Sequence, residues 1–400
     1  MNQLTTAHAE YSLARFPEDP RDTLRAWDAS DEYLLRQLDG TAALDGTTAR
    51  PVDLAGTVVV LGDRWGALAT AVAAATAASP GPHSVVQISD SYLTQQATRA
   101  NLERNGLAAD AVTLLSTLDA PPARIDVLLV RVPKSLALLE DQLLRVAPGV
   151  HEGTVVIGTG MVTEIHTSTL KLFERILGPT RTSLAVKKAR LILCTPDPQL
   201  APAASAWPVS YTLPADDASL GAAAGLTVTN EAGIFSAERL DVGTRFLLQH
   251  LPARTGSEHV VDLGCGNGIV GTAAALGNPD AVVTFADESH QALASARATF
   301  QASGSPAKAE FLLGDGLASL PPGSVDLVLN NPPFHSHQAT TDAAARRMFS
   351  DARTVLRPGG QLWVVGNRHL NYHVTLRRLF GNCVTIGSGP KFVVLRATKR

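Results

Sequence analysis

The feature that most constrains how this chain folds is an internal repeat of its own sequence. The stretch TVVVLGDRWGALATAVAAA (57–75) corresponds to HVVDLGCGNGIVGTAAALG (259–277), about 200 residues further along. Further matching pairs follow in the same order, among them RIDVLLVRVPK (124–134) and SVDLVLNNPPF (324–334). Because the order of the matches is kept although their identity is weak, the sequence predicts a tandem duplication of one domain.

Each repeat alternates short apolar runs with helix-length amphipathic stretches. In the second repeat, HVVDLGC (259–265) and AVVTFAD (281–287) are predicted strands, and SHQALASARATFQASG (289–304) is a predicted helix. Strands and helices in alternation are typical of a parallel, doubly wound sheet with helices on both faces. We therefore expect two Rossmann-like α/β domains in tandem.

The boundary between the two domains is predicted from a proline-rich stretch. Between Thr195 and Ala237 the alternation of runs is interrupted, and prolines stand at positions 196, 198, 202, 208 and 214. Proline and small polar residues of this kind mark connecting segments. The predicted organisation is a first domain at 1–195, a linker at 196–215 and a second domain at 216–400.

Charge and cysteine content exclude several classes of protein. The formal net charge is −3, which argues against binding nucleic acid by bulk attraction. Cys194, Cys265 and Cys383 are far apart and outside any CxxC spacing, so neither a disulfide framework nor a zinc site is indicated. The N-terminal residues lack a signal-peptide pattern, and no apolar segment is long enough to span a bilayer. These features predict a cytoplasmic protein without a metal or a membrane partner.

Differences between the repeats indicate where a site was kept. The second repeat holds polar, glycine, proline and aromatic residues at Asp262, Gly266, Asn331, Pro332 and Phe334. The counterparts in the first repeat are Val60, Arg64, Arg131, Val132 and Lys134. We expect that the second repeat kept a ligand site and that the first, degenerate repeat lost it.

The motif DLGCGNGIVG predicts a tight turn from a strand into a helix. Gly264, Gly266 and Gly268 allow this turn and leave room for a ligand to touch the backbone. Gly266, Gly268 and Gly271 also spell GxGxxG, the dinucleotide fingerprint, and Asp287 about 20 residues later can hold a ribose in either case. The glycines alone therefore leave a nicotinamide cofactor open.

Carboxylates at the ends of three predicted strands favour a different cofactor. Asp262 lies inside its strand, where it suits a cationic amino-acid group better than a pyrophosphate. Asp315 ends the run LLGD and can accept a hydrogen bond from an adenine amine, while Asp287 can hold a ribose. S-adenosylmethionine carries a sulfonium, an ammonium, a ribose diol and an adenine amine, so this acidic pocket fits it and does not fit NAD. The alternative for Asp287 and Asp315 is that they cap helices.

The stretch LVLNNPPFHSHQ ends an apolar strand in Asn331, Pro332, Pro333 and Phe334. Two adjacent prolines supply no backbone donor and fix φ, so the chain leaves the sheet in a stiff, extended conformation. Stiff loops at the ends of strands often carry the chemistry of an α/β protein. We therefore predict that this loop is the reactive part of the site.

These motifs together carry a family resemblance. With DLGCGNG, LLGD and NPPF, the second half resembles the class I S-adenosylmethionine-dependent methyltransferases, among which NPPF is the signature of enzymes that methylate exocyclic or amide nitrogens. With the degenerate first repeat and GIFSAERLDVGTRFLLQHLP (233–252), nearly the whole chain resembles the bacterial ribosomal RNA guanine-N2 methyltransferases. ADESHQA, NPPFHSHQATTD and VVGNRHLNYHVTLRRLFGN look closest to the members that act on large-subunit (23S) RNA.

The resemblance implies methyl transfer from S-adenosylmethionine to the exocyclic N2 amine of a guanine in 23S ribosomal RNA. This amine is a poor nucleophile because its lone pair is delocalised into the ring. The side-chain carbonyl of Asn331 and the backbone carbonyl of Pro332 can accept from its N–H groups, and Pro333 stiffens the loop. Phe334 offers a face to a flipped-out base.

Two basic stretches are predicted to hold the RNA. Residues 171–190 contain six Lys/Arg and one Glu, and residues 366–400 contain seven Lys/Arg and no carboxylate. On charge alone such runs are usually solvated surface. The resemblance favours an RNA footprint, which we assign to Lys187, Lys188, Arg190, Arg368, Arg377 and Arg378.

Several alternatives are open at this point. The substrate can be small-subunit (16S) RNA instead, and NPPF also serves methylation of a glutamine amide in a protein or of adenine in DNA. In a non-enzymatic alternative, the chain is an RNA-binding ribosome-assembly module, for which Arg131 and Lys134 of the first repeat are suggestive. His335 and His337 have no third ligand nearby, so a metal site is not expected.

Overall fold

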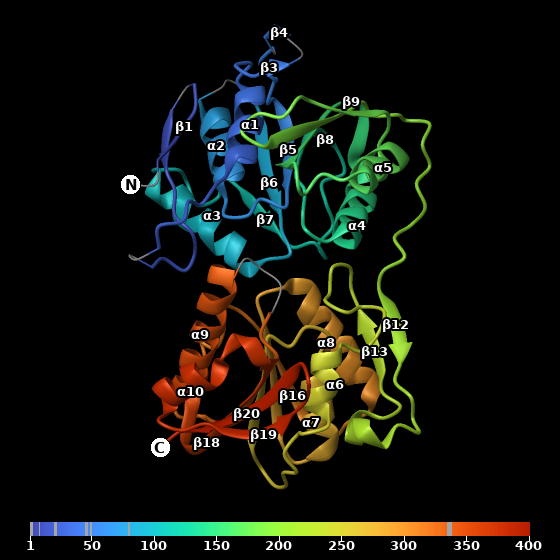
Figure 1. The fold of residues 1–400 in the computed structure, drawn as a ribbon. Helices are drawn as coiled ribbons and strands as arrows, with labels where there is room; N and C mark the ends of the chain where they lie inside the picture. The colour runs from blue at the N-terminus through green and yellow to red at the C-terminus, as the bar shows by residue number, and fades with distance from the viewer. Residues whose placement is uncertain are drawn as a thin grey trace. The chain divides into compact units, whose positions relative to one another are not determined.

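The computed structural model describes residues 3–7, 9–19, 22–44, 47–48, 50–78, 81–333 and 338–400. The chain separates into two compact units, Met1–Ala206 and Trp207–Arg400 (Figure 1). Each unit is built on one seven-stranded sheet of its own. The expectation of two α/β domains in tandem is confirmed.

The two sheets have the same strand order. In the first unit the strands lie in the order β10 (Thr180–Thr182), β11 (Ala189–Cys194), β9 (Val150–Met161), β8 (Ile125–Arg131), β5 (Gly56–Leu61), β6 (His83–Ile88) and β7 (Thr113–Leu115). In the second unit the order is β19 (Val384–Ser388), β20 (Phe392–Thr398), β18 (Leu356–Asn367), β17 (Val325–Asn330), β14 (His259–Leu263), β15 (Val282–Asp287) and β16 (Lys308–Leu313). Counted along the chain within each unit, both sheets read 6-7-5-4-1-2-3.

One strand in each sheet runs against its neighbours. Strand β11 is antiparallel to β9 and β10, and β20 is antiparallel to β18 and β19. The prediction of a wholly parallel sheet is therefore wrong for this strand. The reason is that a short connection precedes each of them, and a short connection can only reverse the chain into a hairpin.

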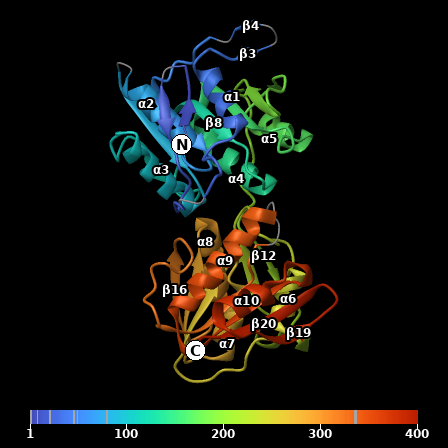
Figure 2. The same ribbon diagram turned by 60° about the vertical axis from the view of Figure 1, so that its left-hand side comes forward.

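Helices cover both faces of each sheet (Figure 2). In the first unit, α1 (Ala29–Leu38), α2 (Ala67–Ala77) and α3 (Tyr92–Arg104) contribute to one core, and α4 (Leu136–Val146) and α5 (Thr167–Ile176) to a second. In the second unit, α6 (Val242–Leu248), α7 (Ile269–Gly277) and α8 (His290–Ser303) contribute to one core, and α9 (Gln338–Val355) and α10 (Tyr372–Phe380) to the other. Two cores per sheet make each unit doubly wound. No helix in the described part of the chain is long and apolar enough to cross a membrane.

Smaller elements complete the fold. Three two-stranded antiparallel sheets pair β1 (Gln3–Thr5) with β2 (Glu10–Ser12), β3 (Ala43–Leu44) with β4 (Thr47–Thr48), and β12 (Val209–Thr212) with β13 (Thr227–Asn230). Short 3-10 helices are η1 (Ala147–Gly149), η2 (Ala218–Ala223) and η3 (Arg368–Leu370). Among these smaller elements, the β12–β13 hairpin contacts the candidate site described below through Asn230.

Matching contacts in the two units support the duplication. The Asp126 carboxylate accepts from the backbone N–H of Thr57 at 2.8 Å, joining the fourth strand to the first. At the matching positions of the second unit, the Asp326 carboxylate accepts from the N–H of His259, also at 2.8 Å. A side-chain contact kept at both copies is a stronger sign of common origin than a shared strand order, because many sequences can form the same sheet.

The connection between the units is shorter than the predicted linker at 196–215. The second unit begins at Trp207, and β12 starts at Val209 and pairs with β13, Thr212 opposite Thr227. The partner strand lies about 15 residues further along, so the local pattern around residue 210 does not reveal the pairing.

Candidate active site

The candidate site lies where β14 turns into α7. Gly264, Gly266 and Gly268 all have positive φ, at 69°, 53° and 73°. A Cβ on Gly268 would lie 2.7 Å from the Cα of Ala296 in α8, so only glycine lets the turn pack there. A Cβ on Gly266 would meet nothing within 4 Å. The backbone of the turn is thus open on the side of Gly266, where a ligand can approach.

Asp262 links β14 to the first turn of α7 by a hydrogen bond. Its side chain is buried, and one carboxylate oxygen accepts from the backbone N–H of Gly271, in the first turn of α7, at 2.7 Å. Burial raises the pKa of Asp262 to about 7; the bond from Gly271 opposes the rise and the charge of Asp287 adds to it. The structure therefore gives Asp262 a helix-supporting contact that the sequence analysis did not foresee.

The first unit shows that this support does not require an acid inside the strand. Val60 stands at the position of Asp262, but Asp63 in the following turn is buried and accepts from the N–H of Ala69 at 2.8 Å. Ala69 matches Gly271 of the second unit. Since a carboxylate in the turn is enough to hold the helix, helix support alone does not explain why the acid of the second unit lies inside the strand.

Asp287 ends β15 and fixes the same turn. One of its oxygens accepts from the N–H of Gly266 and the other from the N–H of Ser289, each at 3.0 Å. Both bonds hold backbone N–H groups, one in the glycine turn and one just before α8. Asp287 thus combines the capping role with an orientation beside the open glycine turn.

Asp315, which follows β16, has a partner that sequence reasoning missed. Arg347 of α9 forms an ion pair with it at 2.8 Å. Burial raises the pKa of Asp315, and the charge of Arg347 opposes this rise. Asp351, one turn further along α9, is also half-buried, and burial with the charge of Asp315 raises its pKa to about 6. The spacing of Arg347 and Asp351, four residues apart on one helix, is the sequence signal that could have suggested the cluster.

Asn331 directly follows β17 and presents a free acceptor. Its side-chain N–H2 group donates to the hydroxyl of Thr244 at 2.9 Å. Its side-chain oxygen is buried and has no hydrogen-bond partner among the described residues. A buried polar atom without a partner is costly, so such an atom beside a ligand site is a sign of function.

The neighbours of Asn331 anchor the loop. Asn330 is buried and donates to the backbone carbonyl of Leu263 at 2.7 Å, which ties β17 to β14. Pro332 is buried, whereas Pro333 is exposed. Phe334, His335 and His337 lie outside the residues that the structure describes, so the predicted stacking role of Phe334 is a proposal only.

The β12–β13 hairpin, which precedes β14 in the sequence, contacts the glycine turn. Asn267, inside the turn, donates from its side-chain nitrogen to the side-chain oxygen of Asn230 at the end of β13, at 2.9 Å. The hydroxyl of Tyr211, on β12, lies beside Asn267, and burial raises the pKa of Tyr211 to about 12. Sequence reasoning missed this contact because the hairpin falls partly inside the segment predicted to be a linker.

In the first unit, charged side chains fill the matching positions. Arg131, at the place of Asn331, is fully buried and contacts Asp28 at 2.8 Å, Glu164 at 2.8 Å and Asp31 at 3.4 Å. Arg64, at the place of Gly266, pairs with the same Asp28 at 3.2 Å and with Glu164. We call these five residues the charge cluster. Its side chains occupy the region that the glycine turn leaves open in the second unit.

The charge cluster has three carboxyl groups and two guanidinium groups. Burial alone would raise the pKa of Asp28 and Glu164, but Arg131 beside them holds both below the usual values. Asp31 is the most buried of the three, and burial raises its pKa to about 7 in spite of Arg131. Asp31 is therefore the carboxyl group of the cluster whose pKa lies nearest to neutral pH.

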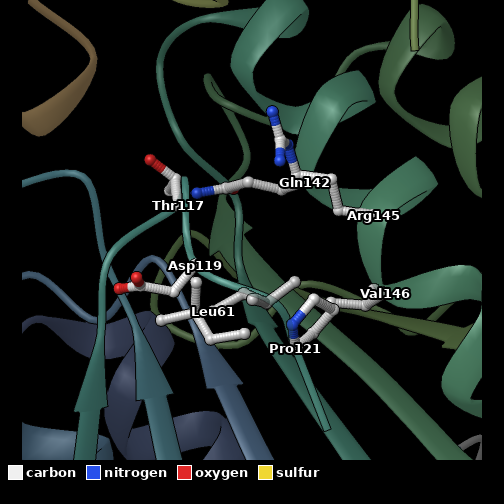
Figure 3. A pocket seen from close by; sticks show the side chains of 8 residues that line it. Leu61, Thr117, Asp119, Pro121, Gln142, Arg145 and Val146 are labelled. Atoms are coloured by element: carbon white, nitrogen blue, oxygen red, sulfur yellow. The ribbon is translucent and has the colours of Figure 1, made fainter. Parts of the chain in front are cut away.

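A small pocket of the first unit does not substitute for the lost site. It lies between α4 and the segment after β7 and is lined by Leu61, Ile88, Thr117, Asp119, Pro121, Gln142, Arg145 and Val146 (Figure 3). Its volume is roughly 10 Å³, the room that one water molecule needs. A nucleoside cannot enter a space of this size.

The residues assigned to RNA are exposed except for Arg190, and they fall at two edges. Lys187 and Lys188 form an exposed turn with positive φ, 49° and 63°, and Lys187 pairs with Glu32 at 2.9 Å, while Arg190 is half-buried. The turn precedes Ala189, which lies opposite Met161 at the carboxyl end of β9. The first group therefore lies at the edge of its sheet that corresponds to the candidate site.

The second group is divided by α10. Arg368 directly follows the carboxyl end of β18 and is exposed at the edge of Asn331. Arg377 and Arg378 lie in the last turn of α10, and this helix runs back along the sheet for nine residues, about 13 Å. The basic run of the sequence therefore does not form one patch at the site.

Comparisons with known proteins agree with this architecture. Residues 1–198 match the family model described as the RLMG N-terminal domain, and residues 225–396 match the methyltransferase small domain. A solved 16S rRNA N2 methyltransferase of Thermus thermophilus, in complex with AdoMet and guanosine, is similar over 100% of this chain and 97% of that one, with a TM-score of 0.74 and 21% identity. The TM-score shows that the two proteins share the tandem fold.

Curated relatives match the chain from end to end. The protein of Streptomyces griseus called ribosomal RNA large subunit methyltransferase G is 67% identical over 402 residues, covering 100% of both chains. The proteins of the same name from Streptomyces coelicolor and Aeromonas salmonicida are 64% and 44% identical, each over 99% of this chain. This chain therefore belongs to the ribosomal RNA large subunit methyltransferase G family.

Proposed function

We propose that this chain transfers a methyl group from S-adenosylmethionine to the exocyclic N2 amine of a guanine in 23S ribosomal RNA. The observation that carries the proposal is the buried side-chain oxygen of Asn331, which has no partner among the described residues and lies at the end of β17. An amine that donates two N–H groups is the partner this acceptor lacks. The name of the relatives supports large-subunit RNA over the small-subunit alternative.

The residues of the loop act on the amine. The side-chain oxygen of Asn331 and the backbone carbonyl of Pro332 accept from its two N–H groups and draw the nitrogen toward pyramidal geometry, which frees its lone pair for attack. When bound, S-adenosylmethionine supplies a methyl group on a positively charged sulfur. No strong base is needed, because the methylated, ammonium-like nitrogen passes its proton readily to water. Phe334 is proposed to stack on the flipped-out guanine.

The residues around the glycine turn fit the cofactor. The open face of Gly266 admits a ligand to the backbone, and Asp287 beside it can accept from a ribose diol while it holds Gly266 and Ser289. Asp315 can accept from the adenine amine with the capacity that Arg347 leaves. Asp262 is placed to balance the cationic amino-acid end, aided by Gly264 and Gly268 in the turn.

We assign the first unit, predicted as residues 1–195, to RNA binding and support of the fold, and the catalytic step to the domain predicted at 216–400. Lys187, Lys188, Arg190 and Arg368 are proposed to contact RNA phosphates, and Arg377 and Arg378 to contribute only if the RNA extends along α10. Ribosomal RNA as substrate and free cysteines at all three positions both suit a cytoplasmic enzyme.

Nucleoside analysis tests the proposal. Ribosomal RNA from a strain lacking the gene should lose one N2-methylguanosine from the 23S molecule, and the purified protein with S-adenosylmethionine should restore it. Loss from 16S RNA alone would overturn the large-subunit assignment. Unchanged nucleosides in both RNAs would favour the assembly-module alternative, and methylation of a protein glutamine or of DNA adenine would replace the substrate class.

A further inference from the structure

We propose that Thr244, which Asp241 holds in place, is a positioning residue for Asn331. It determines that the side-chain oxygen of Asn331, and not its side-chain nitrogen, faces the site. The proposal rests on the proposed function, because it concerns the acceptor that would hold the target amine. Neither residue was assigned this role from the sequence. The inference comes from a chain of three side chains that joins α6 to the end of β17.

The hydrogen bonds that link Asp241, Thr244 and Asn331 define which group donates and which accepts at each step. Asp241 is the N-cap of α6, and one of its oxygens accepts both from the backbone N–H of Thr244 at 2.8 Å and from the Thr244 hydroxyl at 3.4 Å. The hydroxyl of Thr244 has a single proton, and that proton points to a carboxylate. The oxygen of Thr244 is therefore left as an acceptor, and the side-chain N–H2 group of Asn331 donates to it at 2.9 Å.

The direction matters because an amide has two unlike ends. With its nitrogen turned to Thr244, Asn331 presents its side-chain oxygen to the site, and this oxygen has no partner in the part of the chain that the structure describes. A flipped amide would present N–H groups to a guanine amine that is itself a donor. The flipped form would repel the substrate, so a fixed orientation preorganises the reaction.

The first unit shows that this contact is built into the fold. Asp28 caps α1 as Asp241 caps α6, and Asp31 stands three residues into α1 as Thr244 does in α6. Asp31 contacts Arg131, the counterpart of Asn331, at 3.4 Å. In both copies, the third residue after the helix cap therefore contacts the matching residue at the carboxyl end of the fourth strand. Both members of the pair differ between the copies. The carboxyl group of Asp31 faces the guanidinium of Arg131 in the first unit, and the hydroxyl of Thr244 faces the amide of Asn331 in the second.

The experiment removes only the hydroxyl. Thr244→Val keeps the shape of the side chain and the capped N–H, so we expect kcat to fall by about tenfold while the KM for S-adenosylmethionine stays within about twofold. Thr244→Ser keeps the hydroxyl and should retain kcat within about threefold. Thr244→Ala serves as a second deletion if the valine variant does not fold, with the same expected loss.

A double-variant cycle separates positioning from a structural role. If Thr244 acts through Asn331, then Thr244→Val combined with Asn331→Ala should be no slower than Asn331→Ala alone. Multiplied losses, or full activity of Thr244→Val, would overturn the inference. Thr70→Val, which removes a buried hydroxyl with no partner among the described residues of the first unit, is the matched control and should keep wild-type kcat.

The cycle also keeps the two proposals apart. Full activity of Asn331→Ala would reject the proposed function of that residue itself. A slow Asn331→Ala together with a fully active Thr244→Val would reject only the positioning role.

Discussion

The guanidinium of Arg131 in the first unit and the side-chain amide of Asn331 in the second occupy matching positions at the carboxyl end of the fourth strand, Arg131 as the last residue of β8 and Asn331 as the first residue after β17. The register shows this, because Leu61 lies opposite Val130 and Leu263 lies opposite Asn330. Arg131 carries only donors and faces three carboxyl groups, whereas the side-chain oxygen of Asn331 is an acceptor without a partner among the described residues. Together with Arg64 in place of Gly266, this exchange gives the first unit an ion cluster at the position of the loop that we propose to be reactive in the second unit.

The first prediction concerns the number of cofactor sites. Arg64 and Arg131 place side chains of the charge cluster where the second unit has an open glycine turn. Titration calorimetry should therefore find one S-adenosylmethionine per chain. Two equivalent sites would contradict the decay of the first copy.

The second prediction concerns Asn331 alone. Asn331→Ala removes one oriented acceptor at the reacting centre, so the rate should fall by about a hundredfold or more. The affinity for S-adenosylmethionine should stay within a few-fold, as measured by calorimetry. Asn382→Ala is the control. The side-chain amide of Asn382, just beyond the end of α10, donates to the backbone carbonyls of Phe380 and Thr398, so its loss should affect stability but not rate. Loss of cofactor binding in Asn331→Ala would make the residue structural.

The third prediction concerns the charge cluster. Arg131→Ala leaves buried carboxylates without their cation, so it should destabilise the first unit by about 3–5 kcal/mol. Arg64→Ala, at a side chain 37% exposed, should cost only about 1 kcal/mol. Hydrogen exchange of the β5 and β8 amides reports the free energy of opening of this unit. Equal effects of the two variants would show that burial does not decide the strength of the cluster.

The fourth prediction concerns the pH dependence of stability. Aspartate ionises near pH 4 in an unfolded chain, whereas burial raises the pKa of folded Asp262 to about 7. The folded protein keeps a proton that the unfolded chain has lost, so this residue costs stability increasingly from about pH 4 to about pH 7 and little more above.

Asp262→Asn removes that dependence and keeps an oxygen for the N–H of Gly271. Without cofactor, its melting temperature should exceed that of the wild type by a margin that grows from about pH 4 to about pH 7 and changes little above. S-adenosylmethionine, whose ammonium favours the ionised carboxylate, should narrow the margin. A margin that does not change with pH would refute the raised pKa.

The fifth prediction concerns the RNA. Each phosphate contact contributes about 0.7–0.9 to the slope of log affinity against log salt. Lys187→Gln with Lys188→Gln should therefore lower that slope by up to about 1.8, and Arg368→Gln by up to about 0.9. Arg377→Gln with Arg378→Gln, at the far end of α10, is the paired comparison and should change it less. The opposite ranking would place the RNA along α10 instead of at the carboxyl edge.

Some properties of this protein follow from local sequence. Alternating apolar runs predicted the strands and helices, the repeat predicted two domains, and the glycines of 264–268 predicted the turn, since backbone conformation depends mainly on neighbouring residues. Asn331 was identified because an Asn-Pro-Pro run after a strand is unusual in itself. The reversed strand and the early start of β12 were missed because hairpin partners are set by packing as well as by pattern.

The tertiary structure decided which side chains meet. Thr244 and Asn331 lie 87 residues apart in sequence, and Asp28 and Arg131 lie 103 apart. The tertiary structure likewise brings Arg347 next to Asp315. The direction of α10 separates Arg368 from Arg377. Sequence determines which groups are available and how the backbone turns near them. Distances, burial and therefore pKa values arise only when the sheet brings distant strand ends to one edge and excludes water from between them.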